Sequence, residues 1–216
     1  MKLPAEREAV AAACRRLAAE GLVIQTAGNI SVRCGDEVVI TPSGGVFEEL
    51  EADQMTIVDM DGEVVDGRHG PSSEVALHLL AYARLDHVGA VVHTHAPMAT
   101  ALSCVVDEVP AVHYSMLSLG GAIKVAEYAT FGTEVLARNV VAELERAPAT
   151  LMRSHGAITY GGDLDQAVEQ MRLLEWACTV YWRARMIGEP AVMTPEQAED
   201  VVKVYTERNY GRLSEA

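Results

Sequence analysis

The sequence has 216 residues, 50% of them hydrophobic and 22% charged, as is typical of a globular domain with a full-sized core. Its formal net charge of −14 argues against binding to nucleic acid or to an anionic membrane surface. The N-terminus lacks the order of a signal peptide, no apolar stretch reaches the length of a membrane span, and the cysteines form no CxxC pair. We therefore expect a cytoplasmic protein with a single domain over residues 1–216.

Hydrophobic spacing in the first part of the chain predicts one helix, then strands, then a second helix. The first helix is expected over 6–20. Short strands are expected at 30–33, 37–40 and 55–58, because glycine-containing turns separate these apolar runs. Ser72 or Ser73 is then expected to cap the next helix.

The second part of the chain alternates between strand and helix patterns. The predicted elements are a strand at 89–95, a short helix at 98–102, a helix at 133–144, a strand at 149–152, a long helix that begins at Asp163 or Asp165, and a last helix that Thr194, Pro195 and Gln197 begin. No repeat or linker interrupts this order, which indicates a mixed α/β domain.

The strand at 89–95 ends with two histidines, His93 and His95, on either side of Thr94. Side chains alternate along a strand, so both imidazoles should face one side and Thr94 the other. Two imidazoles form half of a typical catalytic zinc site, which takes three protein ligands and keeps one position open. His155 is the candidate third ligand. Histidines that serve only packing remain the open alternative.

Three turns that combine glycine with hydroxyl side chains precede the histidine pair. They are Thr26-Ala27-Gly28-Asn29, Thr41-Pro42-Ser43-Gly44-Gly45 and Gly70-Pro71-Ser72-Ser73-Glu74. Glycine lets backbone N–H groups approach an anion, and hydroxyls add donors, so such turns can bind phosphate. Each turn taken alone also fits an ordinary polar turn.

Glu74 is the last residue of the third turn and is expected in the first turn of a helix. An acidic residue there can simply complement the helix dipole. Close to a divalent metal, it can instead act as a general base that removes a proton beside a polarised carbonyl. Four residues further on, His78 is interpreted as a surface or packing residue of the same helix.

These motifs occur in the order found in the class II aldolase/adducin family, and the chain resembles that family from the first helix to about Tyr210. The motifs that carry the resemblance are Thr26-Ala27-Gly28-Asn29, Thr41-Pro42-Ser43-Gly44, Pro71-Ser72-Ser73-Glu74, His93-Thr94-His95-Ala96, Tyr128-Ala129-Thr130-Phe131-Gly132-Thr133 and His155-Gly156. Within the family, the chain is most similar to the fuculose-phosphate aldolases.

The resemblance implies a three-layer α/β/α fold around a central, largely antiparallel sheet. It also implies a homotetramer with active sites between subunits. The expected activity is a zinc-dependent, reversible cleavage of a ketose 1-phosphate, such as L-fuculose 1-phosphate, to dihydroxyacetone phosphate and an aldehyde such as L-lactaldehyde. Histidine ligands also bind Co²⁺ or Mn²⁺, so the metal identity stays open.

The same resemblance implies a role for each matching residue. The metal ligands would be His93, His95 and His155, with Glu74 as a fourth ligand that also acts as the catalytic acid and base. The substrate phosphate would be held by Thr26, Asn29, Ser43, Gly44, Ser72 and Ser73. Tyr114 would transfer a proton to the aldehyde oxygen in a neighbouring subunit's site, and Phe131 and Tyr210 would line the aldehyde pocket.

Other activities within the family remain alternatives. They are a 5-deoxyribulose-1-phosphate aldolase, an L-ribulose-5-phosphate 4-epimerase, a methylthioribulose-1-phosphate dehydratase and a non-enzymatic interaction module like the adducin head. Glu74 favours the aldolase over the epimerase, which typically carries aspartate there. The complete set of three histidines and Glu74 disfavours the adducin-like module.

Overall fold

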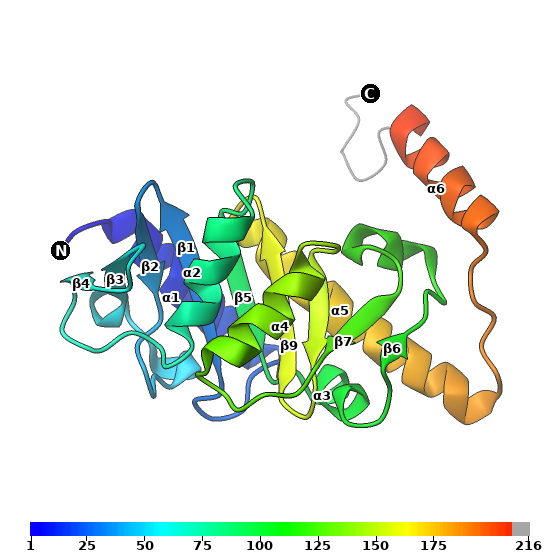
Figure 1. The fold of residues 1–216 in the computed structure, drawn as a ribbon, viewed down its shortest axis with the longest axis horizontal. Helices are drawn as coiled ribbons and strands as arrows, with labels where there is room; N and C mark the ends of the chain where they lie inside the picture. Colours follow the sequence, from blue (N-terminus) through cyan, green and yellow to red (C-terminus); the bar gives the residue numbers. More distant parts are fainter. Residues whose placement is uncertain (209–216) are drawn as a thin grey trace.

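A single mixed sheet forms the middle layer of the molecule, and helices cover both of its faces (Figure 1). The structure, a computed structural model, describes residues 1–208. The strands are β1 (Gly28–Cys34), β2 (Glu37–Ile40), β3 (Thr56–Asp59), β4 (Val64–Asp66), β5 (Ala90–Thr94), β6 (Glu108–Val109), β7 (Ile123–Ala126), β8 (Ala149–Met152) and β9 (Gly156–Gly161). In the described residues the sheet order is β4-β3-β2-β1-β5-β9-β8-β7-β6.

Every neighbouring pair of strands in this sheet is antiparallel except β7 and β8. The helices are α1 (Pro4–Ala19), α2 (Val75–Arg84), α3 (Pro97–Ser103), α4 (Glu134–Leu144), α5 (Leu164–Ile187) and α6 (Pro195–Arg208), with short 3-10 helices η1 (Phe47–Glu49), η2 (Ala52–Gln54) and η3 (Tyr114–Leu119). The expected α/β fold around a largely antiparallel sheet is confirmed.

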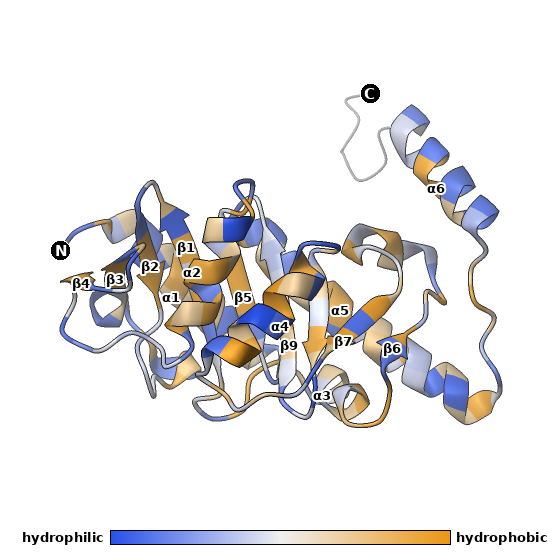
Figure 2. Ribbon diagram, viewed as in Figure 1, coloured by the Kyte–Doolittle hydropathy of each residue, from blue (hydrophilic) through white to orange (hydrophobic). Residues whose placement is uncertain are grey.

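Two hydrophobic clusters fill the space on either side of the sheet. Residues of α1, α3 and α5 pack on one face, and residues of α2 and α4 pack on the other. Strand β5 contributes to both clusters because its side chains alternate: Val92 packs toward α5 and Val91 toward α2. Figure 2 accordingly shows hydrophobic residues on β5 and α2, whereas α6 is mostly hydrophilic.

Helix α6 lies away from the sheet and contacts η3 (Figure 1). In the described part of the chain, no helix combines the length and the hydrophobicity that a membrane crossing needs.

The predicted helix caps agree with the structure except at one helix. Asp163 accepts a hydrogen bond from the backbone N–H of Gln166 in the first turn of α5, as expected. At the start of α6, Thr194 Oγ1 accepts from the N–H of Gln197, and Gln197 Oε1 accepts from the N–H of Thr194, also as expected. The prediction that Ser72 or Ser73 caps α2 is wrong, because Glu74 occupies the N-cap position. The Ser72 hydroxyl instead accepts a hydrogen bond from the backbone N–H of Glu74, which stabilises the turn before the helix.

Candidate active site

Three imidazole rings meet at the end of β5. The ring centroids of His93 and His95 are 5.1 Å apart, and each lies 4.9 Å from the ring centroid of His155. One ligand nitrogen from each histidine lies within 4.8 Å of the other two. Thr94 points to the opposite side, as predicted, and its hydroxyl donates to Met171 Sδ of α5 at 3.2 Å. The structure thus brings the three predicted metal ligands together.

The third histidine reaches the other two because β8 and β9 form a tight hairpin beside β5. Met152 pairs with Gly156 across this hairpin, and His155 N donates to Met152 O. Ser154 adopts a left-handed backbone conformation with φ of 53°, which turns the chain sharply before His155. Gly156 then starts β9, where a Cβ atom would lie only 2.5 Å from the carbonyl oxygen of Thr94.

The protonation of the three rings leaves nitrogen lone pairs free for a cation. His93 Nδ1 lies 2.9 Å from the carbonyl oxygen of Ala157, so Nδ1 carries a hydrogen. Burial opposes protonation of this ring, but the Glu74 carboxylate raises the pKa of His93, so a cation bound at Nε2 would take the place of a proton there. Burial, reinforced by the neighbouring imidazole of His93, lowers the pKa of His95 and of His155 to about 4. Both are therefore neutral near pH 7, the form in which imidazole binds metals.

Glu74 faces the histidines from the start of α2. Its Oε2 lies 3.3 Å from His93 Nε2, and its Oε1 lies 3.6 Å from His155 Nε2. Asn29 on β1 donates to Oε2 at 2.9 Å. Burial alone would raise the pKa of this carboxyl, but the imidazole of His93 and the amide of Asn29 hold it below its usual range. Glu74 is therefore an ionised carboxylate.

Two buried atoms at this point lack a hydrogen-bond partner within residues 1–208: His93 Nε2 and Glu74 Oε1. Such atoms are costly to leave unsatisfied. A divalent cation bound by the three imidazoles would satisfy the His93 lone pair and would balance the Glu74 charge. Three neutral nitrogens and one carboxylate also form a normal ligand set for zinc, so the residues present fit a metal ion.

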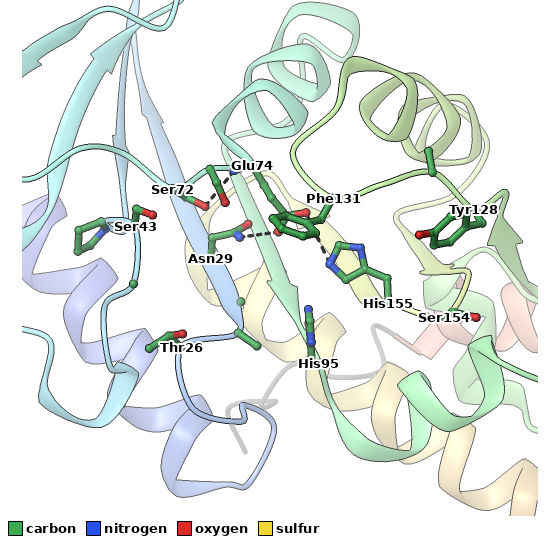
Figure 3. A pocket seen from close by; sticks show the side chains of 16 residues that line it. Thr26, Asn29, Ser43, Ser72, Glu74, His95, Tyr128, Phe131, Ser154 and His155 are labelled. Atoms are coloured by element: carbon green, nitrogen blue, oxygen red, sulfur yellow. Dashed lines mark hydrogen bonds and ion pairs between the residues drawn. The ribbon is translucent and has the colours of Figure 1, made fainter.

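A cavity of about 460 Å³ opens in front of these groups. Most of the site residues expected from the sequence line it, namely Thr26, Asn29, Ser43, Gly44, Ser72, Ser73, Glu74, His95, Phe131 and His155. Figure 3 shows Thr26, Asn29, Ser43 and Ser72 on one side of the cavity and His155 on the other. The three separate turns of the sequence therefore form one polar wall opposite the histidines.

Among the described residues, two expected site residues, His93 and Tyr114, are not part of this lining. Tyr114 lies on η3 and borders a different hollow, beside Val201 and Val204 of α6. Tyr210 lies outside the described residues. Conversely, Tyr128 and Ser154 line the cavity although sequence reasoning gave them no role. Ser154 directly precedes His155, and Tyr128 belongs to the same motif as Phe131, so position in these motifs was the available signal.

Of the two interpretations of His78, the structure excludes the surface residue and supports the packing residue. His78 is fully buried, and its Nε2 lies 2.5 Å from Asn29 Oδ1. The signal for this contact is helical spacing, because Glu74 and His78 are four residues apart and therefore lie on one face of α2.

Comparison with known proteins agrees with this geometry. The family model described as the class II aldolase and adducin N-terminal domain matches residues 8–182. The chain belongs to this family. Its similarity to a solved L-fuculose 1-phosphate aldolase structure has a TM-score of 0.91 at 32% sequence identity and covers 95% of this chain and 98% of that one.

Two curated relatives in the family carry other substrate names. The 5-methylthioribulose-1-phosphate/5-deoxyribulose-1-phosphate aldolase of Rhodospirillum rubrum is 39% identical over 92% of this chain and 89% of its own length. The 5-deoxy-D-ribulose 1-phosphate aldolase of Bacillus thuringiensis is 32% identical over 98% of this chain and 100% of its own length. The expected resemblance to the class II aldolases is thus confirmed, and the relatives differ in the sugar phosphate that they are named for.

Proposed function

We propose that this chain is a metal-dependent aldolase that reversibly cleaves a ketose 1-phosphate to dihydroxyacetone phosphate and an aldehyde. The observation that carries the proposal is the group of three histidines facing an ionised glutamate, in one cavity with a wall of hydroxyls and turns. His93, His95 and His155 would hold the metal, for which we propose zinc. The bound metal supplies a Lewis acid for the substrate carbonyl.

Glu74 is suited to move the proton at the carbon that reacts. In the cleavage direction the C4 hydroxyl gives its proton to the group that serves the aldehyde oxygen, and C4 becomes the aldehyde carbon as the C3–C4 bond breaks. The electron pair of that bond stays with C3, and Glu74 returns a proton to C3. In the addition direction Glu74 removes that proton. Its carboxylate is buried and held by Asn29, so it is oriented before the substrate arrives.

The polar wall opposite the histidines is suited to the substrate phosphate. Thr26, Asn29, Ser43, Ser72 and Ser73 offer hydroxyl and amide donors, and Gly44 adds a backbone N–H. The described residues that line the cavity include no lysine or arginine. Hydrogen bonds and local dipoles would thus hold the phosphate, an arrangement that selects by shape.

The aldehyde would lie at the other end of the cavity, near Phe131 and Tyr128. Tyr114 does not line the cavity of its own chain, so we assign its proton transfer to the site of a neighbouring subunit in a homotetramer. Tyr210 is proposed to close the same end.

Two classes of substrate deserve direct comparison, because their aldehyde products differ in polarity. L-Fuculose 1-phosphate would release lactaldehyde, which carries a hydroxyl group. A 5-deoxyribulose 1-phosphate would release acetaldehyde, and its methylthio analogue would release a thioether aldehyde. The second class is favoured by the 39% identity to the Rhodospirillum rubrum relative named for it.

The test is a panel of ketose phosphates incubated with purified, zinc-loaded protein, with dihydroxyacetone phosphate measured as the product. Release from L-fuculose 1-phosphate or from the deoxy and methylthio substrates identifies the class. L-Ribulose 5-phosphate tests the epimerase alternative, and water loss from methylthioribulose 1-phosphate tests the dehydratase. Failure to release dihydroxyacetone phosphate from any member would refute the aldolase proposal, and absence of bound metal would support an adducin-like module.

A further inference from the structure

Behind Glu74, a row of hydrogen-bonded polar side chains runs between α2 and β1 into the core. From the cavity inward, the row passes from Glu74 to Asn29, His78, Ser31 and Tyr82. Asn29 is only 4% exposed, and the three residues behind it are completely buried. A polar row of this length is costly to bury unless each member is satisfied, so its arrangement has a structural or functional reason.

The row is possible because the repeats of a helix and a strand nearly match. Glu74, His78 and Tyr82 are spaced four residues apart at the start of and along α2, which corresponds to a rise of about 6 Å per step. Asn29 and Ser31 are two residues apart on β1, which corresponds to about 6.6 Å. Side chains from α2 and β1 therefore alternate in register.

The chemistry of the five groups fixes the direction of every hydrogen bond. The ionised Glu74 can only accept, so Asn29 Nδ2 donates to it at 2.9 Å and Asn29 Oδ1 faces His78 Nε2 at 2.5 Å. A neutral imidazole has one N–H, and here Nε2 must carry it. His78 Nδ1 then accepts from Ser31 Oγ at 2.7 Å, and Ser31 accepts from the hydroxyl of Tyr82 at 2.7 Å.

His78 is held in this neutral form by its surroundings. Burial, with the nearby imidazole of His93, lowers its pKa to about 3, although the Glu74 carboxylate acts in the opposite direction. The ring therefore donates one hydrogen bond toward the cavity at any pH near neutrality.

We propose that His78 is a positioning residue that fixes the side-chain amide of Asn29 and, through it, the carboxylate of Glu74. With Oδ1 held by His78, Nδ2 is turned toward Glu74 and the cavity that Asn29 lines. One Nδ2 hydrogen binds Glu74, and the other is available to the substrate phosphate. A reversed amide would present its oxygen to the carboxylate, and both atoms are acceptors. The catalytic consequence rests on the proposed aldolase function, whereas the orientation of the amide does not.

Two substitutions of similar size separate positioning from simple packing. In His78→Gln, the side-chain amide nitrogen reaches the former Nε2 position and keeps a donor toward Asn29. In His78→Asn, the shorter amide reaches only the Nδ1 position, so the donor is lost. We expect His78→Asn to lower kcat by about 10- to 100-fold, the range typical of residues that support a site from behind. His78→Gln should restore most of this loss.

A double-mutant cycle tests whether His78 acts through Asn29. In an Asn29→Ala background, His78→Asn should cause little further loss of kcat. Fully additive losses, or equal losses in His78→Gln and His78→Asn, would overturn the proposal. Thermal unfolding of each variant reports the loss of packing separately.

Nuclear magnetic resonance of metal-free protein gives a readout that does not depend on activity. We expect the His78 ring to carry its hydrogen on Nε2, and the side-chain amide of Asn29 to exchange slowly with solvent in the wild type and in His78→Gln but rapidly in His78→Asn. A hydrogen on Nδ1, or unchanged amide exchange in His78→Asn, would overturn the proposal. Absence of aldolase activity in a wild type that passes this test would refute the proposed function alone.

Discussion

Replacing Gly156 with alanine should weaken metal binding although Gly156 is not itself a candidate ligand. A Cβ atom at this position would lie 2.5 Å from Thr94 O, 3.0 Å from His95 Cδ2 and 3.2 Å from His93 Cε1. Carbon–oxygen contacts in proteins are usually about 3.3–3.6 Å, so the strand or the carbonyl must move by roughly 1 Å. The new methyl group would thus press on two of the three imidazoles and on the strand between them.

The size of the effect follows from what has to move. The atoms nearest to the new Cβ include backbone in the β5–β9 ladder, where Thr94 pairs with Ala157, so the clash cannot be relieved by a flexible side chain. Overpacking of this kind costs about 1–3 kcal/mol, which corresponds to a decrease of roughly 2–12 °C in Tm for a chain of this length. Metal–ligand distances tolerate only about 0.2 Å, so we expect zinc affinity to fall by about 10- to 100-fold.

The measurement is a zinc titration against a competing chelator, together with thermal unfolding of the metal-free and zinc-loaded proteins. Gly188→Ala is the control, because a Cβ atom there would meet nothing within 4 Å and its backbone is extended. Zinc affinity and Tm of Gly156→Ala equal to those of the wild type would refute the reasoning.

Three further predictions concern single side chains. His155→Ala should lose at least about tenfold in zinc affinity, and unchanged metal content after dialysis would contradict its role as a ligand. Glu74→Gln should keep zinc but lower kcat by about 10²- to 10⁴-fold in the panel assay, and near-normal turnover would remove Glu74 from the mechanism. The pKa of His78 is about 3 when folded and 6.5 when unfolded, so the unfolded chain protonates first as the pH falls. Urea unfolding of metal-free protein should show that wild type loses about 2 kcal/mol more than His78→Gln between pH 6.5 and 5, and equal slopes would contradict the buried neutral ring.

The α-helices and five of the strands were predictable because their periodicity is strong, but β4, β6, β7 and β9 were missed. The most consequential of these is β9, which leads out of the His155 turn. Its sequence, from Gly156 to Gly161, has glycine at both ends and looks like a turn. The structure shows why those glycines are there: a Cβ at Gly156 would collide with β5, and a Cβ at Gly161 would collide with the start of α5. A close approach between segments distant in sequence leaves no periodic signal.

The site was predictable where its geometry is local and not where it depends on register. The common direction of His93 and His95 follows from strand alternation alone. The contact between His78 and Asn29 does not follow from local spacing. It depends on the pairing of β1 with β5, in which Asn29 lies opposite His93. A buried polar helix face and a solvated one have the same spacing in sequence, so the sequence left both a surface and a packing position open for His78.

The charge of the candidate site couples the binding of its two expected ligands, the metal cation and the substrate phosphate ester. A phosphate ester would enter a protein of net charge −14, in a cavity that already contains the Glu74 carboxylate. The described lining has no lysine or arginine, and its imidazoles are neutral near pH 7. The full positive charge opposite the substrate would therefore come from the cation that the histidines hold, while hydroxyls and backbone N–H groups contribute only partial charges. Binding of the cation and binding of the phosphate ester must then strengthen each other, because coupling between two sites is reciprocal.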